Sequence, residues 1–229
     1  MQKLDGLLKE TNNLDSAGME LRIRQAKDYM EMAQLYKSAI REITTKLEVL
    51  DSEFSVRYDH NPIHHIDNRL KSIASIVEKL RRKGAAVSIE NAKAYLTDIA
   101  GVRVVCNYID DIYRIADMLC AQDDIVVLRR TDYIENPKEN GYRSLHVIVE
   151  VPIFLKDIKK PMKVEIQFRT IAMDFWASLE HQIHYKASRE VPDCVVDELK
   201  ECADIIAHTD ERMQSLSKQI RCIRDTHEK

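Results

Sequence analysis

Two short stretches decide the expected fold: residues 97–106, TDIAGVRVVC, and residues 163–169, KVEIQFR. The β-branched run in the first predicts a buried strand over residues 99–106. The second alternates polar and apolar side chains with the two-residue period of a strand, so its apolar members share one face and Glu165, Gln167 and Arg169 share the other. Further strands are expected at residues 125–128, 145–154 and 162–168, the last two joined as a hairpin by the charged residues 156–161. The centre of the chain is therefore predicted to be a small mixed sheet.

Helices are expected on both sides of this sheet. Apolar residues recur in alternating steps of four and three from Tyr29 to Phe54 and again from Val195 to Ile223, which predicts two long helices, each with an apolar seam. The break at Asn61-Pro62 separates the first from a second predicted helix at 63–84. Shorter helices are predicted over 89–96, 110–121 and 170–187.

The composition fits one globular domain without membrane segments. The 229 residues divide into a helical extension at 1–58, a core at 59–188 and a C-terminal helix at 189–229. The net charge of -3 makes no case for nucleic-acid binding. No apolar stretch approaches the roughly 20 residues that span a bilayer, and the first residues lack a secretory signal core. Five scattered cysteines without a CxxC pattern favour a reduced, cytoplasmic protein.

Residues 69–83 carry six basic side chains against one acidic side chain. On a helix, Lys71, Ser75, Lys79 and Arg82 would share one stripe, with cations about 6 Å apart along the axis. This spacing suits the successive phosphates of a nucleotide. A solvated basic face is an equally weighted alternative.

Two carboxylates adjoin the predicted strands. Asp98 directly precedes the strand that carries Arg103, and a carboxylate beside cations fits a Mg²⁺ ligand that shares the ion with substrate phosphates. Alternatively, Asp98 is a turn or cap residue. Glu165 is central on a polar strand face, which either meets solvent or lines a site.

The loop at residues 135–144, ENPKENGYRS, has turn chemistry and one tyrosine. Tyr142 offers a flat ring on which a base can stack. Lys138 and Arg143 lie in the same loop and are long enough to reach phosphates. A plain turn with a surface tyrosine is the alternative. The pair His181 and His184 is interpreted as packing or hydrogen-bonding groups, because no third ligand has zinc-site spacing.

Five segments together resemble one family: RLKSIASIVEKL, TDIAGVRVVC, NPKENGYRSLH, VEIQFRT and DFWASLEHQIHYK. In order and spacing they are similar to the (p)ppGpp synthetase domain of the RelA/SpoT homologues, over about residues 60–187. The chain looks like a stand-alone small alarmone synthetase of the RelP/RelQ type. The His-Asp motif of the hydrolase domain in the long relatives does not occur in this sequence.

The resemblance implies an α/β (α+β) fold with a mixed, mostly antiparallel sheet, related to nucleotidyltransferase palms. It implies a GTP pyrophosphokinase that moves pyrophosphate from ATP to the 3′-OH of GDP or GTP, with Mg²⁺ as cofactor and a homotetramer as the assembly. Asp98 and Glu165 match the acidic, Mg²⁺-associated pair, and Glu165 is either the general base or a second metal partner.

The resemblance also assigns nucleotide-binding residues. The matched ATP positions are Arg69, Lys71, Ser75, Lys79 and Arg103, with the two arginines sandwiching adenine. The matched GDP or GTP positions are Lys138, Asn140, Tyr142, His146 and Gln167, with Tyr142 stacking on guanine.

Two other classes of function stay open from the residues alone. Another nucleotidyl- or phosphotransferase on a similar palm would use the same acidic pair and basic segment. A non-enzymatic helical scaffold is supported by the two seams. The apolar surface of these seams predicts self-association through the terminal helices, unless they pair with each other inside a monomer.

Overall fold

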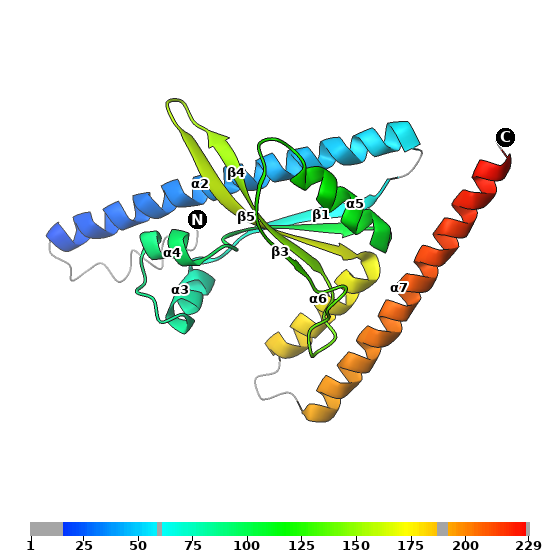
Figure 1. Ribbon diagram of the computed structural model, residues 1–229. Helices are drawn as coiled ribbons and strands as arrows, with labels where there is room; N and C mark the ends of the chain where they lie inside the picture. Colours follow the sequence, from blue (N-terminus) through cyan, green and yellow to red (C-terminus); the bar gives the residue numbers. More distant parts are fainter. Residues whose placement is uncertain (1–15, 59–60, 187–191, 228–229) are drawn as a thin grey trace.

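The computed structural model describes residues 16–58, 61–186 and 192–227 and forms a sheet with helices around it (Figure 1). The elements in chain order are α2 (Ser16–Tyr58), β1 (Ile63–Leu70), α3 (Ile73–Arg82), α4 (Ile89–Tyr95), β2 (Ala100–Cys106), α5 (Ile109–Cys120), β3 (Val126–Asp132), β4 (Leu145–Phe154), β5 (Lys159–Thr170), α6 (Ile171–Lys186) and α7 (Asp193–His227). The first fifteen residues lie outside the described part. No helix of the described part is long and apolar enough to cross a membrane.

The five strands follow the order β1-β2-β5-β4-β3, in which only β2 and β5 are parallel. The predicted mixed, mostly antiparallel sheet is therefore confirmed. The β4–β5 hairpin extends past α2 in Figure 1 and turns at residues 155–158, where Leu155 N donates to Ile158 O. The register places Gly101 beside Glu165 and Arg103 beside Gln167.

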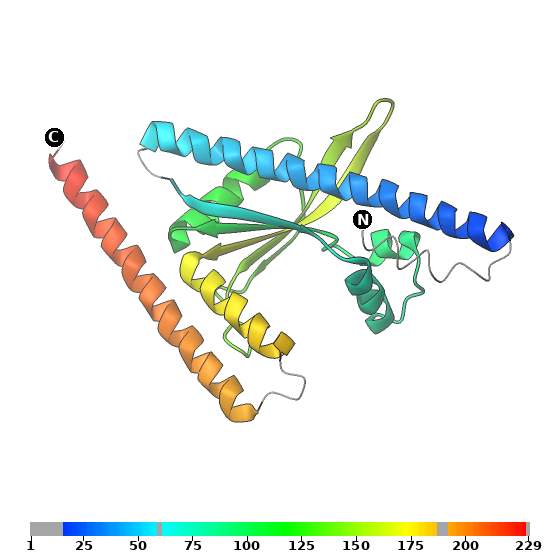
Figure 2. The same ribbon diagram turned by 180° about the vertical axis from the view of Figure 1, so that it is seen from behind.

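One face of the sheet is apolar and is covered by α2 (Figure 2). Val164, Ile166 and Phe168 are fully buried on this face, as the alternation predicted. The seam of α2 packs here as well, and every one of its members from Ala33 to Phe54 is buried. The sheet of the same chain thus satisfies the N-terminal seam, so the expectation that this seam needs a second subunit is wrong.

The predicted helix at 63–84 is the main error in secondary structure. Its first part is the edge strand β1, and only residues 73–82 are helical. β1 pairs with β2 from Ile63 to Leu70, and this hydrogen bonding across 30 or more residues outweighs a local helical pattern that contains the weak helix formers Asp67 and Asn68. Ser72 then caps α3 by accepting a hydrogen bond from Ser75 N. As a result, Arg69 lies on a strand and not on the basic helix.

At the other end of the chain, α7 packs on α6 and on α5. Trp176, Ala177 and Ala203 form a small separate core, in which Trp176 Nε1 donates to Leu199 O. The apolar seam expected on α7 is largely not the face of this helix that packs against the rest of the chain. Four of its members are about half exposed, namely Met213, Leu216, Ile220 and Ile223.

Candidate active site on the polar face of the sheet

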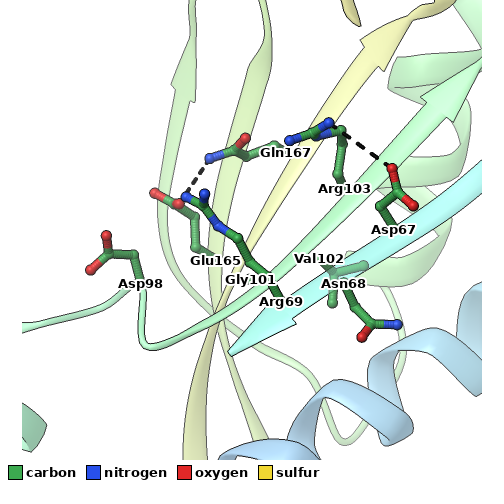
Figure 3. A pocket seen from close by; sticks show the side chains of 9 residues that line it. All are labelled: Asp67, Asn68, Arg69, Asp98, Gly101, Val102, Arg103, Glu165 and Gln167. Carbon is green, nitrogen blue, oxygen red and sulfur yellow. Dashed lines mark hydrogen bonds and ion pairs between the residues drawn. The ribbon is translucent and has the colours of Figure 1, made fainter. Parts of the chain in front are cut away.

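A pocket lies where β1, β2 and β5 meet on the polar face, and we call it the β1–β2–β5 pocket (Figure 3). Its lining residues are Asp67, Asn68, Arg69, Asp98, Gly101, Val102, Arg103, Glu165 and Gln167. Strand register explains the grouping, because Arg69, Gly101 and Glu165 lie side by side on three adjacent strands. Gly101 leaves room there, and the Arg69 side chain crosses it, with Cγ 3.6 Å from where a Cβ would stand.

Asp98 lies at the entry to β2 and is held by two lysines. Its Oδ2 accepts hydrogen bonds from Lys79 Nζ at 2.7 Å and Lys71 Nζ at 3.0 Å. Burial alone would raise the pKa of Asp98, but the hydrogen bonds and charges of the two lysines outweigh it and hold the pKa below its usual range. The buried Oδ1 atom has no hydrogen-bond partner. An ionised carboxylate with one unpartnered buried oxygen fits a metal ligand.

Glu165 lies in the middle of β5 and is mostly buried. Its Oε2 accepts a hydrogen bond of 2.9 Å from Gln167 Nε2, and its Oε1 is 3.8 Å from His146 Nδ1. Figure 3 shows the carboxyl groups of Asp98 and Glu165 near the same end of the pocket. In the described part of the chain, no three His, Cys, Asp or Glu residues are arranged as a complete metal site. Any ion at the acidic pair would thus depend on ligands from water or substrate.

A second pocket, the β3–β4 pocket, shares Glu165 with the first. Its lining residues are Lys79, Lys83, Tyr95, Thr97, Arg129, Thr131, Tyr133, His146, Ile148 and Glu165. The lining residues include three basic side chains and a single carboxylate. Glu165 is therefore the residue at which the two pockets meet.

Tyr142 lies beside the β3–β4 pocket at the centre of an aromatic and cationic cluster. Its ring lies 6.0 Å from that of Tyr133 and 5.8 Å from that of His146, both edge to face. Lys138 Nζ lies 4.7 Å from the ring centroid, and the Arg169 guanidinium lies 5.1 Å from it. The ring is thus already covered in part by cations, and a base that stacks on it would have to displace the flexible Lys138.

His146 is neutral at pH 7. Burial, together with the positive charges of Arg169, Lys138 and Arg129, lowers the pKa of His146 to about 4. Arg169 donates to Tyr142 Oη at 2.7 Å, and the same hydroxyl shares a hydrogen bond of 2.7 Å with His146 Nε2. The other ring nitrogen, Nδ1, faces Glu165 Oε1 at 3.8 Å.

The loop that bears Tyr142 is fastened to the two C-terminal helices. Asn140 Nδ2 donates to Glu180 on α6, and its Oδ1 accepts from Tyr142 N. Arg143 forms an ion pair of 3.1 Å with Asp204 on α7. Gly141 has φ +86°, and a Cβ there would stand 2.5 Å from Ala203 Cβ. The predicted acceptor loop is therefore held by α6 and α7.

The predicted site residues are only partly brought together. Arg69, Arg103 and Gln167 line the β1–β2–β5 pocket with the acidic pair, and His146 lines the β3–β4 pocket. Lys79 lines the β3–β4 pocket although it was assigned to ATP, and Gln167 lines the β1–β2–β5 pocket although it was assigned to GDP or GTP. The other predicted residues line neither pocket, namely Lys71, Ser75, Lys138, Asn140 and Tyr142.

Sequence reasoning missed several residues of the site. Lys83, Arg129, Thr131 and Tyr133 line the β3–β4 pocket but were not assigned. Strand alternation offered a signal for two of them, since Arg129 and Thr131 share a face of β3 and pair with Ile148 and His146. The predicted strand ended at residue 128, so the alternation beyond this residue was not used. His181 lies on α6, whereas the side chain of His184 is outside the described residues.

An acidic pair between two cation-lined pockets, on the polar face of a mixed sheet, defines an enzyme that transfers groups between phosphorylated substrates. Residues 68–190 match the family described as the region found in RelA / SpoT proteins. The chain belongs to this family.

Named relatives agree with this membership. The chain is 45% identical to GTP pyrophosphokinase YwaC of Bacillus subtilis over 84% of its own length and 92% of the relative's. The crystal structure of small alarmone synthetase 2 of B. subtilis superposes with a TM-score of 0.77 at 44% identity, covering 84% of this chain and 99% of that one. Small alarmone synthetase 1 of B. subtilis, bound to its product pppGpp, gives 0.78 at 35% identity, covering 85% and 99%.

Proposed function

We propose that this chain is a (p)ppGpp synthetase that transfers pyrophosphate from ATP to the 3′-OH of GDP or GTP. Its relatives are named GTP pyrophosphokinases, and one related structure holds the product pppGpp. The observation that carries the assignment is the position of Glu165 at the junction of two pockets, each with cations. A transfer between two nucleotides needs this arrangement, because both must be held with their reacting atoms in line.

In the proposed reaction, ATP occupies the β1–β2–β5 pocket with its adenine between the guanidinium planes of Arg69 and Arg103. The acceptor occupies the β3–β4 pocket, where Lys83 and Arg129 bind its 5′-phosphates and Tyr142 carries the guanine. Glu165 takes the proton of the 3′-OH. The 3′-oxygen bonds to the β-phosphorus of ATP, the bond from that phosphorus to the bridging α–β oxygen breaks, and AMP leaves.

We propose Mg²⁺ as the cofactor, held by Asp98 beside the base Glu165. The unpartnered buried Oδ1 of Asp98 fits this role, while Lys71 and Lys79 occupy the other oxygen. When bound, the ion would neutralise charge on the ATP phosphates. Lys79 lines the β3–β4 pocket and contacts Asp98, which lines the other pocket, so Lys79 is placed to bind a phosphate beside the metal position.

The test uses labelled ATP with GDP, GTP or GMP in the presence of Mg²⁺. The proposed enzyme releases AMP and forms a guanosine 3′-pyrophosphate. A nucleotidyltransferase on the same fold would instead release pyrophosphate, and a scaffold protein would release neither. The initial rates with the three acceptors give the acceptor preference.

We also propose a homotetramer in the cytoplasm. The apolar stripe on α7 formed by Met213, Leu216, Ile220 and Ile223 supports self-association, because it is exposed in the single chain. The scattered cysteines without a CxxC pattern support a reducing compartment.

A further inference from the structure

One carboxylate outside both pockets lies between two arginines of the polar face. Asp174 Oδ1, in the first turn of α6, is 3.2 Å from a terminal nitrogen of Arg103 and 2.9 Å from a terminal nitrogen of Arg169. The side chains of Asp174 and Arg169 are only 16% and 8% exposed. The pair of Asp174 and Arg169 is therefore largely shielded from the water that weakens surface ion pairs, whereas the Arg103 side chain is 30% exposed toward its pocket.

The two arginines lead to different pockets. Arg103 lines the β1–β2–β5 pocket. Arg169 donates to Gln167 Oε1 at 3.1 Å and to the Tyr142 hydroxyl at 2.7 Å, and that hydroxyl contacts His146 in the β3–β4 pocket. A continuous series of contacts thus runs from the adenine side, through Asp174, to the guanine side.

Strand register brings the two arginines together beside this carboxylate. Arg103 pairs with Gln167, and Arg169 pairs with Val105, so the two arginines are near neighbours on the same face of the parallel strands β2 and β5. Two guanidinium groups so close together repel each other where water is scarce. Asp174 compensates both at short range, while Asp67 Oδ2 is 4.0 Å from the same terminal nitrogen of Arg103. Thr170 Oγ1 accepts from Met173 N and so caps the first turn of α6, which carries Asp174.

We propose that Asp174 is a positioning residue that serves both nucleotide sites at once. It holds the Arg103 guanidinium in the plane that meets adenine, and it holds Arg169 against the ring and hydroxyl of Tyr142. It lines neither pocket, so it acts only through the two arginines. This inference rests on the proposed function.

The first experiment compares Asp174→Asn with Asp117→Asn, a control that breaks an exposed ion pair with Arg130, neither member of which lines a pocket of the site. We expect Asp174→Asn to raise the KM for ATP and the KM for the acceptor by about tenfold each, with a smaller change in kcat. The control should leave both KM values unchanged. A variant that is less stable to heat but keeps both wild-type KM values would overturn the proposal, because that result describes a purely structural ion pair.

Double variants test the contacts of Asp174 with Arg103 and with Arg169 separately. In an Arg103→Ala background, Asp174→Asn should no longer change the KM for ATP but should still change the KM for the acceptor. In an Arg169→Ala background the pattern should be the reverse. Full additivity in both backgrounds would contradict action through the arginines.

Direct binding distinguishes failure of this inference from failure of the proposed function. Calorimetric titration with ATP needs no turnover. Weaker ATP binding by Asp174→Asn would therefore support action through Arg103 even if no alarmone were formed. Unchanged ATP binding would refute the action of Asp174 through Arg103. If Asp174→Asn does not fold, Asp174→Glu keeps the charge on a longer side chain, and an altered KM for both substrates is again the supporting result.

Discussion

Nζ of Lys79 lies 2.7 Å from Oδ2 of Asp98, and this contact joins the basic helix α3 to the acidic edge of the central sheet. The lysine lines one pocket and the aspartate the other. The contact occupies one oxygen of the carboxylate and keeps the group ionised, which leaves Oδ1 for another cation. Together with Glu165, this relationship defines the position at which transfer is expected.

The acidic pair supplies the most direct test of the site. Asp98→Asn and Glu165→Gln each remove one charge with little change of shape. We expect each to lower turnover by at least about a hundredfold, the scale of a lost metal or base contribution. Radiolabelled AMP release at saturating substrates measures the effect, and circular dichroism verifies the fold. Near-normal turnover by folded Glu165→Gln would remove Glu165 from the mechanism.

The two nucleotide pockets should respond to different substitutions. Tyr142→Ala should weaken acceptor binding by about 1–3 kcal/mol, the value of stacking one base on an aromatic ring, with little change for ATP. Arg69→Ala should show the opposite bias, because Arg69 lines the pocket assigned to adenine. Titration of each variant with each nucleotide decides the matter. A Tyr142→Ala protein that loses only ATP affinity would reverse the assignment of the pockets.

Gly141 is expected to be critical for the loop that carries Tyr142. In Gly141→Ala, a side chain at φ +86° costs about 1–3 kcal/mol, and its Cβ also meets Ala203 on α7. We expect a raised acceptor KM and a lower free energy of unfolding in urea. Gly84→Ala is the matched control, since Gly84 has φ +68° but open space around it.

A second substitution isolates the steric part of that effect. Combining Gly141→Ala with Ala203→Gly removes the contact between the two Cβ atoms but keeps the backbone strain. The double variant should recover part of the acceptor affinity. If Gly141→Ala alone behaves like Gly84→Ala in both measurements, the contact with α7 does not position the loop.

His146 should make stability depend on pH. Its pKa is about 4 in the folded chain and close to 6.5 when unfolded, so the unfolded chain binds more protons between these values. The stabilising contribution is complete above pH 6.5 and declines as the pH falls toward 4. We expect His146 to account for a loss of about 2 kcal/mol between pH 7 and pH 5.

Urea unfolding of the wild type and of His146→Gln at both pH values measures this contribution. Other groups titrate in the same range, so the informative quantity is the difference between the two proteins. The variant should lose less stability on acidification. Equal losses would mean that His146 is not held neutral by its surroundings.

The exposed stripe of α7 predicts an assembly larger than the 26.6 kDa chain. Leu216→Asp places a charge in the middle of this stripe, and burying an unpaired carboxylate in an interface is costly. Light scattering at micromolar concentration should show a lower mass for the variant. Ser215→Asp adds the same charge at the neighbouring exposed position and should keep the wild-type mass. A wild-type mass that stays near 26.6 kDa on concentration would contradict self-association.

Local sequence patterns were sufficient for the central strands and most of the helices. The alternation at residues 163–169 predicted the buried apolar side chains of β5 and put Glu165 on the polar face, because strand periodicity is a property of neighbouring residues. It did not predict that Arg169 is buried as well. Asp98 was found for a similar reason, at the entry to a short apolar strand. The bounds of β4 and the four-and-three spacing of the apolar seam on α2 were also predicted from the sequence.

Only the tertiary structure decided features that depend on distant partners. Arg69 lies on a strand because β1 adds to the edge of β2, and a local helical pattern could not reveal that edge. The seam of α2 is buried because the apolar face of the sheet, formed by strands far along the chain, covers it. Asp174 stands between Arg103 and Arg169 because the parallel pairing of β2 with β5 brings these arginines together. Periodicity along a chain determines which face a residue occupies, whereas packing between elements determines which residues meet there.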